Sequence, residues 1–409
     1  MKGRLTKLLP FVPPLWAFLL SAALGLLSPF PLGRLQPPDE DAHFLYVKWL
    51  AEGRGLPVFG EGMPTYEAHQ PPLYYALCGA VARLLPKFPE SIRAKAARLL
   101  SSGCGAGAVY ATFVLFSRAG GFKAGIMASA LLAGVPQFVY ISSGVNNDSL
   151  ANFLAVLCFL ALYNCLLRPR DKRAHLLLGA VLGAGLLTKG ALALLIPAVL
   201  LGLLVGPREE VLRRLGLVAL TFLPLALPWA LRNLTLYGDP LAVGAFVQHF
   251  KRMGRPGPEY FLQRGFSLGT YFLLVALLTA KSSFGYFGSM NVPLPAGSYA
   301  LGGLVFFSGL LGWFMKPGQL RLDRPLRSLL LSYGSFLLLL LASFVRFNMH
   351  FFQAQGRYLF PALPLVCYLV GAGLLKLCGR RKAVCALGAV AVLWLHEAWA
   401  LGEFASALR

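Results

Sequence analysis

Charged side chains are scarce in this chain, and acidic side chains are the scarcest. Asp, Glu, Lys and Arg make up only 13% of its 409 residues, whereas soluble globular domains contain about a quarter. The 16 acidic residues face 38 Lys and Arg, which leaves a formal net charge of +22. Hydrophobic residues account for 57% of the chain. This balance excludes an ordinary soluble domain and predicts an integral membrane protein with many spans.

The motifs of nucleotide and zinc chemistry are also missing from the sequence. It contains no GxGxxG turn, no P-loop, no HExxH and no CxxC pair, which argues against a nucleotide cofactor, ATP hydrolysis or structural zinc. The seven cysteines fall in or beside apolar segments and are expected to be small core residues. Most basic residues sit in short loops between apolar segments. That arrangement orients membrane helices, so the net charge does not call for nucleic acid as a partner.

The sequence instead supplies thirteen apolar segments. They lie near residues 8–30, 71–86, 96–117, 122–142, 149–167, 174–188, 189–206, 211–231, 266–287, 299–315, 328–345, 357–377 and 383–400. Lys2, Arg4 and Lys7 place the N-terminus in the cytoplasm. The basic loops then all fall on the cytoplasmic side if segments 71–86 and 266–287 do not cross the membrane. The first is short of the roughly 20 residues that a span needs, and the second contains Lys281.

We therefore expect an all-α, multi-pass protein of the inner (plasma) membrane with about eleven spans. The segments 71–86 and 266–287 would be interfacial or re-entrant helices on the outer face. A transmembrane module over 1–231 would include an outer loop at 31–95. A second outer loop would cover 232–298, and 299–409 would hold the C-terminal transmembrane helices. Because the inner loops are short and basic, we look for chemistry on the outer face.

The first polar cluster there is "QPPDEDAHFLYVKWLAEG", residues 36–53. Its paired prolines are followed by an amphipathic pattern that predicts a helix ending at Gly53. Asp39, Glu40 and His43 are spaced so that all three can face one direction at the start of that helix. Helix capping alone is the alternative, because carboxylates favour helix N-termini. A single cap needs one acid, however, and here three acids cluster beside a bilayer.

Four further motifs lie on the same predicted face. In "YEAHQPPLYY" (66–75), His69 and Gln70 precede a helix start that could receive a phosphate, with Tyr74 in its first turn. "NNDSL" (146–150) contains Asn147 and Asp148, "LTKG" (187–190) contains Lys189, and "QGRYLFP" (355–361) contains Arg357 and Tyr358. Lys189 and Arg357 could hold an anionic group. The alternatives are an aromatic belt, simple capping, snorkelling and interfacial anchoring.

Taken in order, "PPDEDAHF", "HQPPLYY", "NNDSLA", "LTKG" and "QGRYLFP" resemble the GT-C superfamily of membrane glycosyltransferases. That group includes protein O-mannosyltransferases and the aminoarabinose transferases of lipid A, and the chain is most similar to a bacterial branch. The resemblance covers residues 1–200 and 345–365. It implies a GT-C fold with juxtamembrane helices on the outer face, a polyprenyl-phosphate sugar as donor and an extracytoplasmic site. In one respect the chain departs from the aminoarabinose transferases, which have a lysine where Gln70 stands.

The resulting hypothesis is an inverting transfer of sugar from a polyprenyl phosphate to a hydroxyl or amine of a lipid, glycan or protein. Asp39, with Glu40 second, would be the general base, and Asp148 would orient a substrate. Substrate contacts would come from His43, His69, Gln70, Tyr74, Asn147, Lys189, Arg357 and Tyr358. The sequence identifies no certain cofactor, and Asp39, Glu40, His43 and Asp148 could hold a divalent cation. A transporter or flippase for a lipid-linked glycan, or a membrane scaffold, is the alternative.

Overall fold

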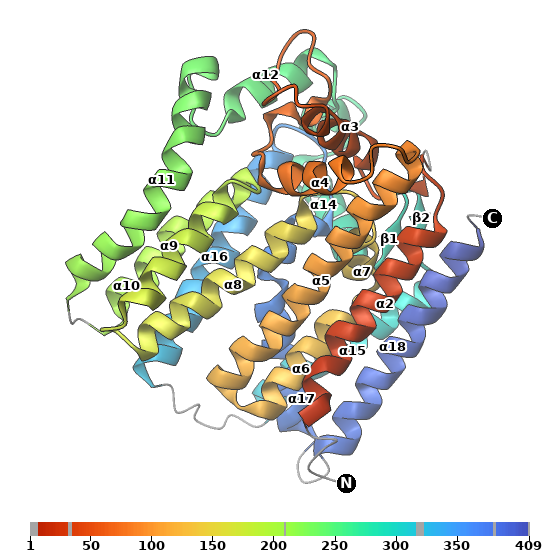
Figure 1. Cartoon of the computed structure of the whole chain (residues 1–409). Coiled ribbons are helices and arrows are strands. Elements are labelled where there is room, and N and C mark those ends of the chain that lie inside the picture. The colour runs from red at the N-terminus through yellow and green to blue at the C-terminus, as the bar shows by residue number, and fades with distance from the viewer. Residues whose placement is uncertain (1–6, 32–34, 208–209, 316–322, 379–381, 408–409) are drawn as a thin grey trace.

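The computed structural model describes residues 7–31, 35–207, 210–315, 323–378 and 382–407, except for the side chains of 382–387. Long helices run side by side through a slab, and short helices gather at one end of it (Figure 1). We call that end the outer end. The C-terminus lies toward the outer end, whereas the described chain begins at the opposite one. Lys2 and Arg4, on which the predicted orientation partly rests, lie outside the described residues.

Seven of the described helical stretches are long and apolar enough to cross a membrane. They are η1–α2 (Leu9–Leu27), α5 (Glu90–Gly120), α8 (Asp148–Leu167), α11 (Val211–Tyr237), α15 (Ala296–Met315), α16 (Arg324–Asn348) and η5–α17 (Gly356–Leu377). The pair α6 (Phe122–Ala133) and α7 (Pro136–Ser142) would be an eighth, bent by 69°. The bend falls at Pro136, the first residue of α7, because proline has no N–H to continue the preceding helix.

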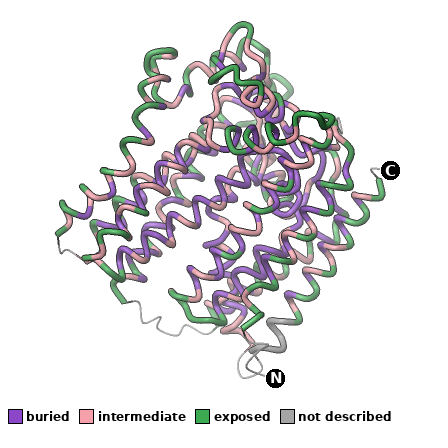
Figure 2. Tube along the Cα trace, viewed as in Figure 1, coloured by how far each residue is buried: buried purple, intermediate pink, exposed green. Residues whose placement is uncertain are grey.

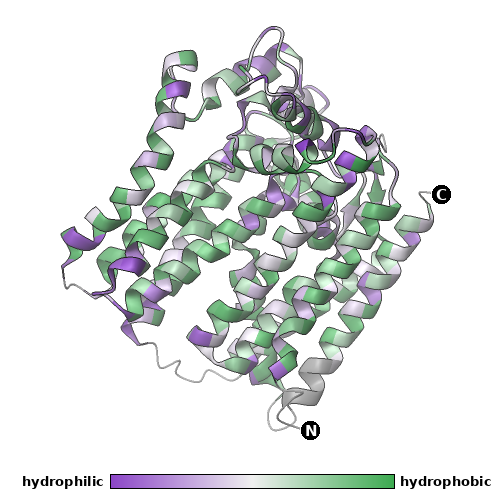
Figure 3. Cartoon of the chain, viewed as in Figure 1, coloured by the Kyte–Doolittle hydropathy of each residue, from purple (hydrophilic) through white to green (hydrophobic). Residues whose placement is uncertain are grey.

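Every one of the thirteen predicted apolar segments forms a helix, which confirms an all-α polytopic membrane protein. The remaining ones are α4 (Leu73–Arg83), α9 (Lys172–Leu186), η4 (Gly190–Leu194) with α10 (Leu195–Val205), α14 (Leu268–Phe284) and α18 (Lys382–Ser406). The number of eleven spans stays a prediction, because length and composition alone identify seven or eight. Figure 3 shows the hydropathy that supports the slab: apolar residues fill its middle and polar residues gather at its two ends.

Helix α5 lies at the centre of one half of the slab, where it packs against α2, α6 and α8. Figure 2 shows the resulting core as a band of buried residues through these helices. The backbones of α15 and α17 approach each other closely at two glycines. A Cβ on Gly312 of α15 would come within 1.9 Å of the carbonyl oxygen of Gly373 on α17. Small residues at such crossings are what bring membrane helices together, because lipid gives no hydrophobic drive for helix association.

The outer end is built from short elements. Loop 31–95 contributes α3 (Glu40–Ala51), η3 (Tyr66–His69) and α4, which at 11 residues is too short to cross, in agreement with its predicted interfacial place. Loop 232–298 holds more structure than the sequence predicted: α12 (Val243–Arg252) and α13 (Pro258–Leu262) precede α14, and β1 (Tyr286–Phe287) pairs antiparallel with β2 (Val292–Pro293).

Candidate active site

A cavity of about 360 Å³ lies where the outer elements meet the slab. It is lined by η3, η4, η5 and the starts of α3 and α8, together with residues from α11, α12 and α16. Its polar wall carries almost all of the residues singled out in the sequence: Asp39, His43, His69, Gln70, Asn147, Asp148, Lys189, Arg357 and Tyr358. Segments more than 300 residues apart in the chain therefore meet in one place.

Asp39 occupies the N-cap position of α3 but does not cap the helix. Its backbone is in the left-handed region, with φ of 67°, and its side chain accepts no hydrogen bond from the first turn. Instead, Oδ2 lies 2.5 Å from Nη2 of Arg357, and Oδ1 accepts a hydrogen bond of 2.9 Å from the Tyr66 hydroxyl. Burial alone would raise the pKa of Asp39, but the charges of Arg357 and His43, together with the hydrogen bonds from Arg357 and Tyr66, lower the pKa to about 2.

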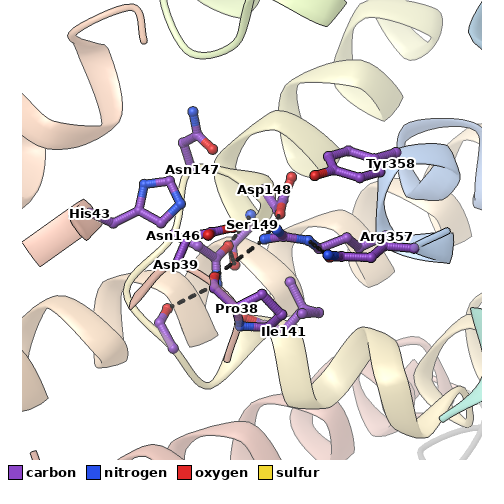
Figure 4. A network of polar contacts seen from close by, with 12 residues as sticks. Pro38, Asp39, His43, Ile141, Asn146, Asn147, Asp148, Ser149, Arg357 and Tyr358 are labelled. Atoms are coloured by element: carbon purple, nitrogen blue, oxygen red, sulfur yellow. Dashed lines mark hydrogen bonds and ion pairs between the residues drawn. The ribbon is translucent and has the colours of Figure 1, made fainter. Parts of the chain in front are cut away.

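Asp148 begins α8 and is bound by two cations from distant segments. Its Oδ1 accepts a hydrogen bond from Nζ of Lys189, and its Oδ2 lies 3.2 Å from Nη1 of Arg357. The two cations also face the ring of Tyr358, at 5.6 Å and 5.3 Å from its centroid. Figure 4 shows Arg357 reaching between Asp148 and Asp39. Asp39, Arg357, Asp148 and Lys189 thus form a chain of alternating charges, which we call the charge quartet.

Glu40 is not part of this cavity, although it is adjacent to Asp39 in sequence. Both of its oxygens are 2.8 Å from the guanidinium of Arg98 on α5, and Oε1 also accepts the N–H of Val145 at 2.8 Å. Arg98 in turn donates to the carbonyls of Gly25 and Ser28 at the end of α2. Glu40 and Arg98 are both fully buried. This geometry suits a structural tie between α2, α3 and α5 and leaves Glu40 no access to a substrate.

Of the remaining sequence-predicted residues, His69, Gln70 and Asn147 line the cavity, whereas Tyr74 does not. Gln70 accepts a 3.2 Å hydrogen bond from Asn147, which also donates to the carbonyl of Thr188, so these two side chains brace the cavity wall. Burial lowers the pKa of His69 to about 4, and its ring is neutral near pH 7. Tyr74 points away from the cavity, since it is fully buried and its hydroxyl lies 2.7 Å from that of Ser101.

The start of α4 is less open than its paired prolines suggested. Pro71 and Pro72 have no N–H, and the N–H of Leu73 donates to the carbonyl of Leu187 at 2.8 Å. The first donor of the helix is therefore occupied by a neighbouring turn. Among the described residues, three cations line the cavity: Lys189 and Arg357, which lie at the starts of η4 and η5, and Arg255, which precedes α13.

Sequence reasoning passed over several polar residues of the cavity lining, among them Tyr66 and Glu67. Tyr66 holds Asp39, as described above, and Glu67 follows it in η3. Glu67 is only 6% exposed, and its Oε2 is buried without a hydrogen-bond partner among the described residues. Both lie in "YEAHQPP", the motif in which the sequence pattern points to His69 and Gln70. The one available signal was a third acid near the face that Asp39 and Asp148 were expected to share.

The proposed divalent cation does not fit this arrangement. Within the described residues, no group of three or more His, Cys, Asp or Glu side chains is arranged to hold a metal ion. The guanidinium of Arg357 occupies the space between Asp39 and Asp148, and Glu40 faces Arg98 instead. We derive no step through a metal.

Much of the remaining lining of the cavity is apolar. It includes Leu186, Leu194, Trp229, Val243, Phe246, Phe250, Leu340, Phe344 and Phe347. These side chains come from the end of α9, η4 and the helices α11, α12 and α16. The cavity therefore combines charged and hydrocarbon-like surfaces within one space. Such a space suits an amphiphile with an anionic head and a long apolar tail.

Comparison with known proteins points in one direction. A profile of the family described as dolichyl-phosphate-mannose-protein mannosyltransferase matches residues 69–231. No curated protein sequence matches the chain. Similar solved structures include ArnT from Cupriavidus metallidurans bound to undecaprenyl phosphate, at 17% identity and a TM-score of 0.56, over 88% of this chain and 58% of that one.

A second group of similar structures comes from Archaeoglobus fulgidus. Its oligosaccharyltransferase AglB, in complex with an inhibitory peptide and a dolichol-phosphate, matches at 17% identity and a TM-score of 0.58, over 98% of this chain and 56% of that one. The chain thus spans somewhat more than half the length of these proteins. At such identities the likeness concerns the fold. As the sequence motifs implied, the chain has the fold of the GT-C superfamily of membrane glycosyltransferases.

Proposed function

We propose that this protein is a glycosyltransferase that takes a sugar from a polyprenyl-phosphate donor and passes it to an acceptor on the extracytoplasmic face. One observation carries the proposal: Arg357 and Lys189 face a cavity whose remaining lining is largely apolar. A polyprenyl-phosphate sugar combines the same two features, an anionic phosphate and a long hydrocarbon. The structural relatives ArnT and AglB, with undecaprenyl phosphate and dolichol-phosphate respectively, support this donor class.

The charge quartet fits the change in charge that such a transfer produces. The donor is a phosphodiester with one negative charge, and the departing lipid phosphate is a monoester with two. Arg357 and Lys189 are already positioned at the cavity wall, so they can stabilise the second charge as it develops. Because Arg357 is buried and the Lys189 side chain is only 14% exposed, this interaction is stronger than it would be in water.

The bonds exchange in one step. An acceptor oxygen or nitrogen attacks the anomeric carbon, the bond from that carbon to the phosphate oxygen breaks, and its electron pair leaves with the lipid phosphate. The acceptor proton passes to a carboxylate of the cavity. Attack opposite to the leaving phosphate inverts the anomeric carbon. The acceptor is a hydroxyl or amine of a lipid, glycan or protein.

We assign Asp39 a different role from the general base that its motif suggested. Both of its oxygens accept hydrogen bonds, and its pKa of about 2 makes it a weak base while Arg357 stays in place. We assign Asp39 and Asp148 to holding the two cations in position for the phosphate. Glu40 is assigned to the structural tie with Arg98.

Donor binding tests the proposal. Purified protein in lipid nanodiscs should bind radiolabelled undecaprenyl phosphate, and R357Q should weaken that binding about ten- to hundredfold, because it removes charged hydrogen bonds to the phosphate. R346Q is the matched control, since Arg346 is exposed on α16 and does not line the cavity.

Transfer itself is then measured with a panel of radiolabelled undecaprenyl-phosphate sugars, with release of free sugar to water as the minimal reaction. We expect at least one donor to be turned over by the wild type and not by R357Q. Equal affinity of R357Q and R346Q for undecaprenyl phosphate would exclude Arg357 as the phosphate ligand. A wild type that binds none of these lipids would refute the function.

A further inference from the structure

Glu67 is the one carboxyl of the cavity that has no partner. In the charge quartet, each carboxylate is matched with a cation, so Asp39 and Asp148 are already engaged. Glu67 is nearly as buried as Asp148, yet it makes no ion pair and its buried Oε2 has no hydrogen-bond donor in the described part of the chain. A buried polar atom without a partner costs free energy. Because Glu67 also lines the cavity, its carboxyl is free to engage a ligand there.

The backbone that carries Glu67 is held in place by hydrogen bonds on both sides. Thr65 caps η3 by accepting the N–H of Glu67 at 3.2 Å, and its hydroxyl donates to the carbonyl of Ala42 on α3 at 2.8 Å. The carbonyl of Glu67 accepts the N–H of Gln70 at 2.9 Å. The turn is therefore anchored at both ends. A proton acceptor needs this kind of positioning, because efficient transfer depends on a short, aligned approach.

The charges that face Glu67 come from three sides of the cavity. His43 and Asp39 lie on α3, Arg357 on η5, and Lys189 before η4. Burial raises the pKa of Glu67 above its ordinary value, and this effect outweighs the attraction of the surrounding cations. Glu67 is therefore a stronger base than Asp39, whose pKa lies at about 2.

From this geometry we infer that Glu67 is the catalytic base, with its carboxylate taking the proton of the attacking acceptor. This inference rests on the proposed glycosyl transfer and assigns its proton step. As the acceptor oxygen or nitrogen bonds to the anomeric carbon, its proton moves to Glu67 and the electron pair of the broken bond leaves on the lipid phosphate. His43 lies beside Glu67, and its Nδ1 is 2.8 Å from the Tyr75 hydroxyl. We do not assign His43 as the base, because burial lowers the pKa of its imidazole.

Comparison of E67Q with D39N separates the two carboxylates. The assay uses the donor from the undecaprenyl-phosphate sugar panel that the wild type turns over, with water as acceptor, and undecaprenyl phosphate for binding. E67Q should bind undecaprenyl phosphate like the wild type and lose about 10²–10⁴-fold in kcat. E67D should recover part of the rate. D39N should weaken lipid-phosphate binding, because Arg357 loses one of its two carboxylates. E61Q is the control, as Glu61 is exposed on the same loop.

The dependence of kcat on pH gives a second readout. In the wild type, kcat should rise with pH through the ionisation of Glu67, and E67Q should lack this acidic limb in its residual rate. If the limb persists in E67Q, or if E67Q turns over like E61Q, Glu67 is not the base. If D39N loses turnover at unchanged lipid affinity while E67Q stays active, Asp39 is the base. Neither outcome touches the glycosyl-transfer proposal, which fails only if the wild type neither binds nor turns over the lipids.

Discussion

At the scale of single residues, the sequence motifs predicted most of the polar residues that line the cavity but not the contacts that each residue makes. "PPDEDAHF" predicted an acidic cluster at the start of a helix, and the structure does bring Asp39 to a cavity shared with Asp148. The motif could not show that the next residue, Glu40, points to Arg98. Glu67 could not be predicted either, because nothing in "YEAHQPP" reveals whether a carboxyl finds a partner. Pairing depends on residues far away in the chain.

The unpaired carboxyl of Glu67 should also affect stability. Its pKa is raised in the folded protein, so the folded state binds a proton more tightly than the unfolded chain does. The wild type should therefore become more stable as the pH falls from the raised pKa toward the ordinary value of a glutamate. E67Q, which is neutral at every pH, should have a higher Tm than the wild type at neutral pH, and the difference should vanish in acid.

Thermal unfolding of detergent-solubilised E67Q and E61Q across this range measures the effect. E61Q should follow the wild type at each pH, since Glu61 is exposed. A Tm difference between E67Q and wild type that stays constant with pH would mean that Glu67 does not titrate in the folded protein.

At the scale of elements, hydropathy predicted where helices lie better than where they break. Segment 122–142 reads as one apolar run, but Pro136 divides it into α6 and α7. Loop 232–298 was expected to contain one interfacial or re-entrant helix, and α12 and α13 were missed. Both are short, and α12 mixes aromatic with basic residues. The formation of α12 and α13 depends on packing against the outer loops more than on a continuous apolar sequence.

The junction of α2, α3 and α5 should depend on its buried ion pair. E40Q leaves the charge of Arg98 buried without a counter-charge, which typically costs about 3–5 kcal/mol. E90Q removes an exposed partner of Lys48 and should cost less than about 1 kcal/mol. We expect a much lower Tm for E40Q than for E90Q, with partial recovery in the E40M/R98M double variant, which removes both charges. Equal Tm values for E40Q and E90Q would show that the tie is dispensable.

At the scale of the whole molecule, the outer end should face away from the cytoplasm. Basic loops at the other end, such as 168–173, follow the positive-inside pattern. A cysteine at the exposed Glu61 position (E61C) should react with a membrane-impermeant maleimide in intact cells. A cysteine at Lys172 (K172C) should react only after permeabilisation. The unmodified chain serves as the background for its own cysteines, and the reverse labelling pattern would place the cavity on the cytoplasmic side.

The pairing inside the charge quartet has a consequence for what can bind in the cavity. Two positive and two negative side chains pair with one another, so a small soluble anion such as inorganic phosphate would have to break existing ion pairs to reach Arg357 or Lys189. A lipid donor differs, because contact of its hydrocarbon with Trp229, Phe344 and their neighbours can offset that cost. Selectivity against water-soluble phosphates would then arise from the tail.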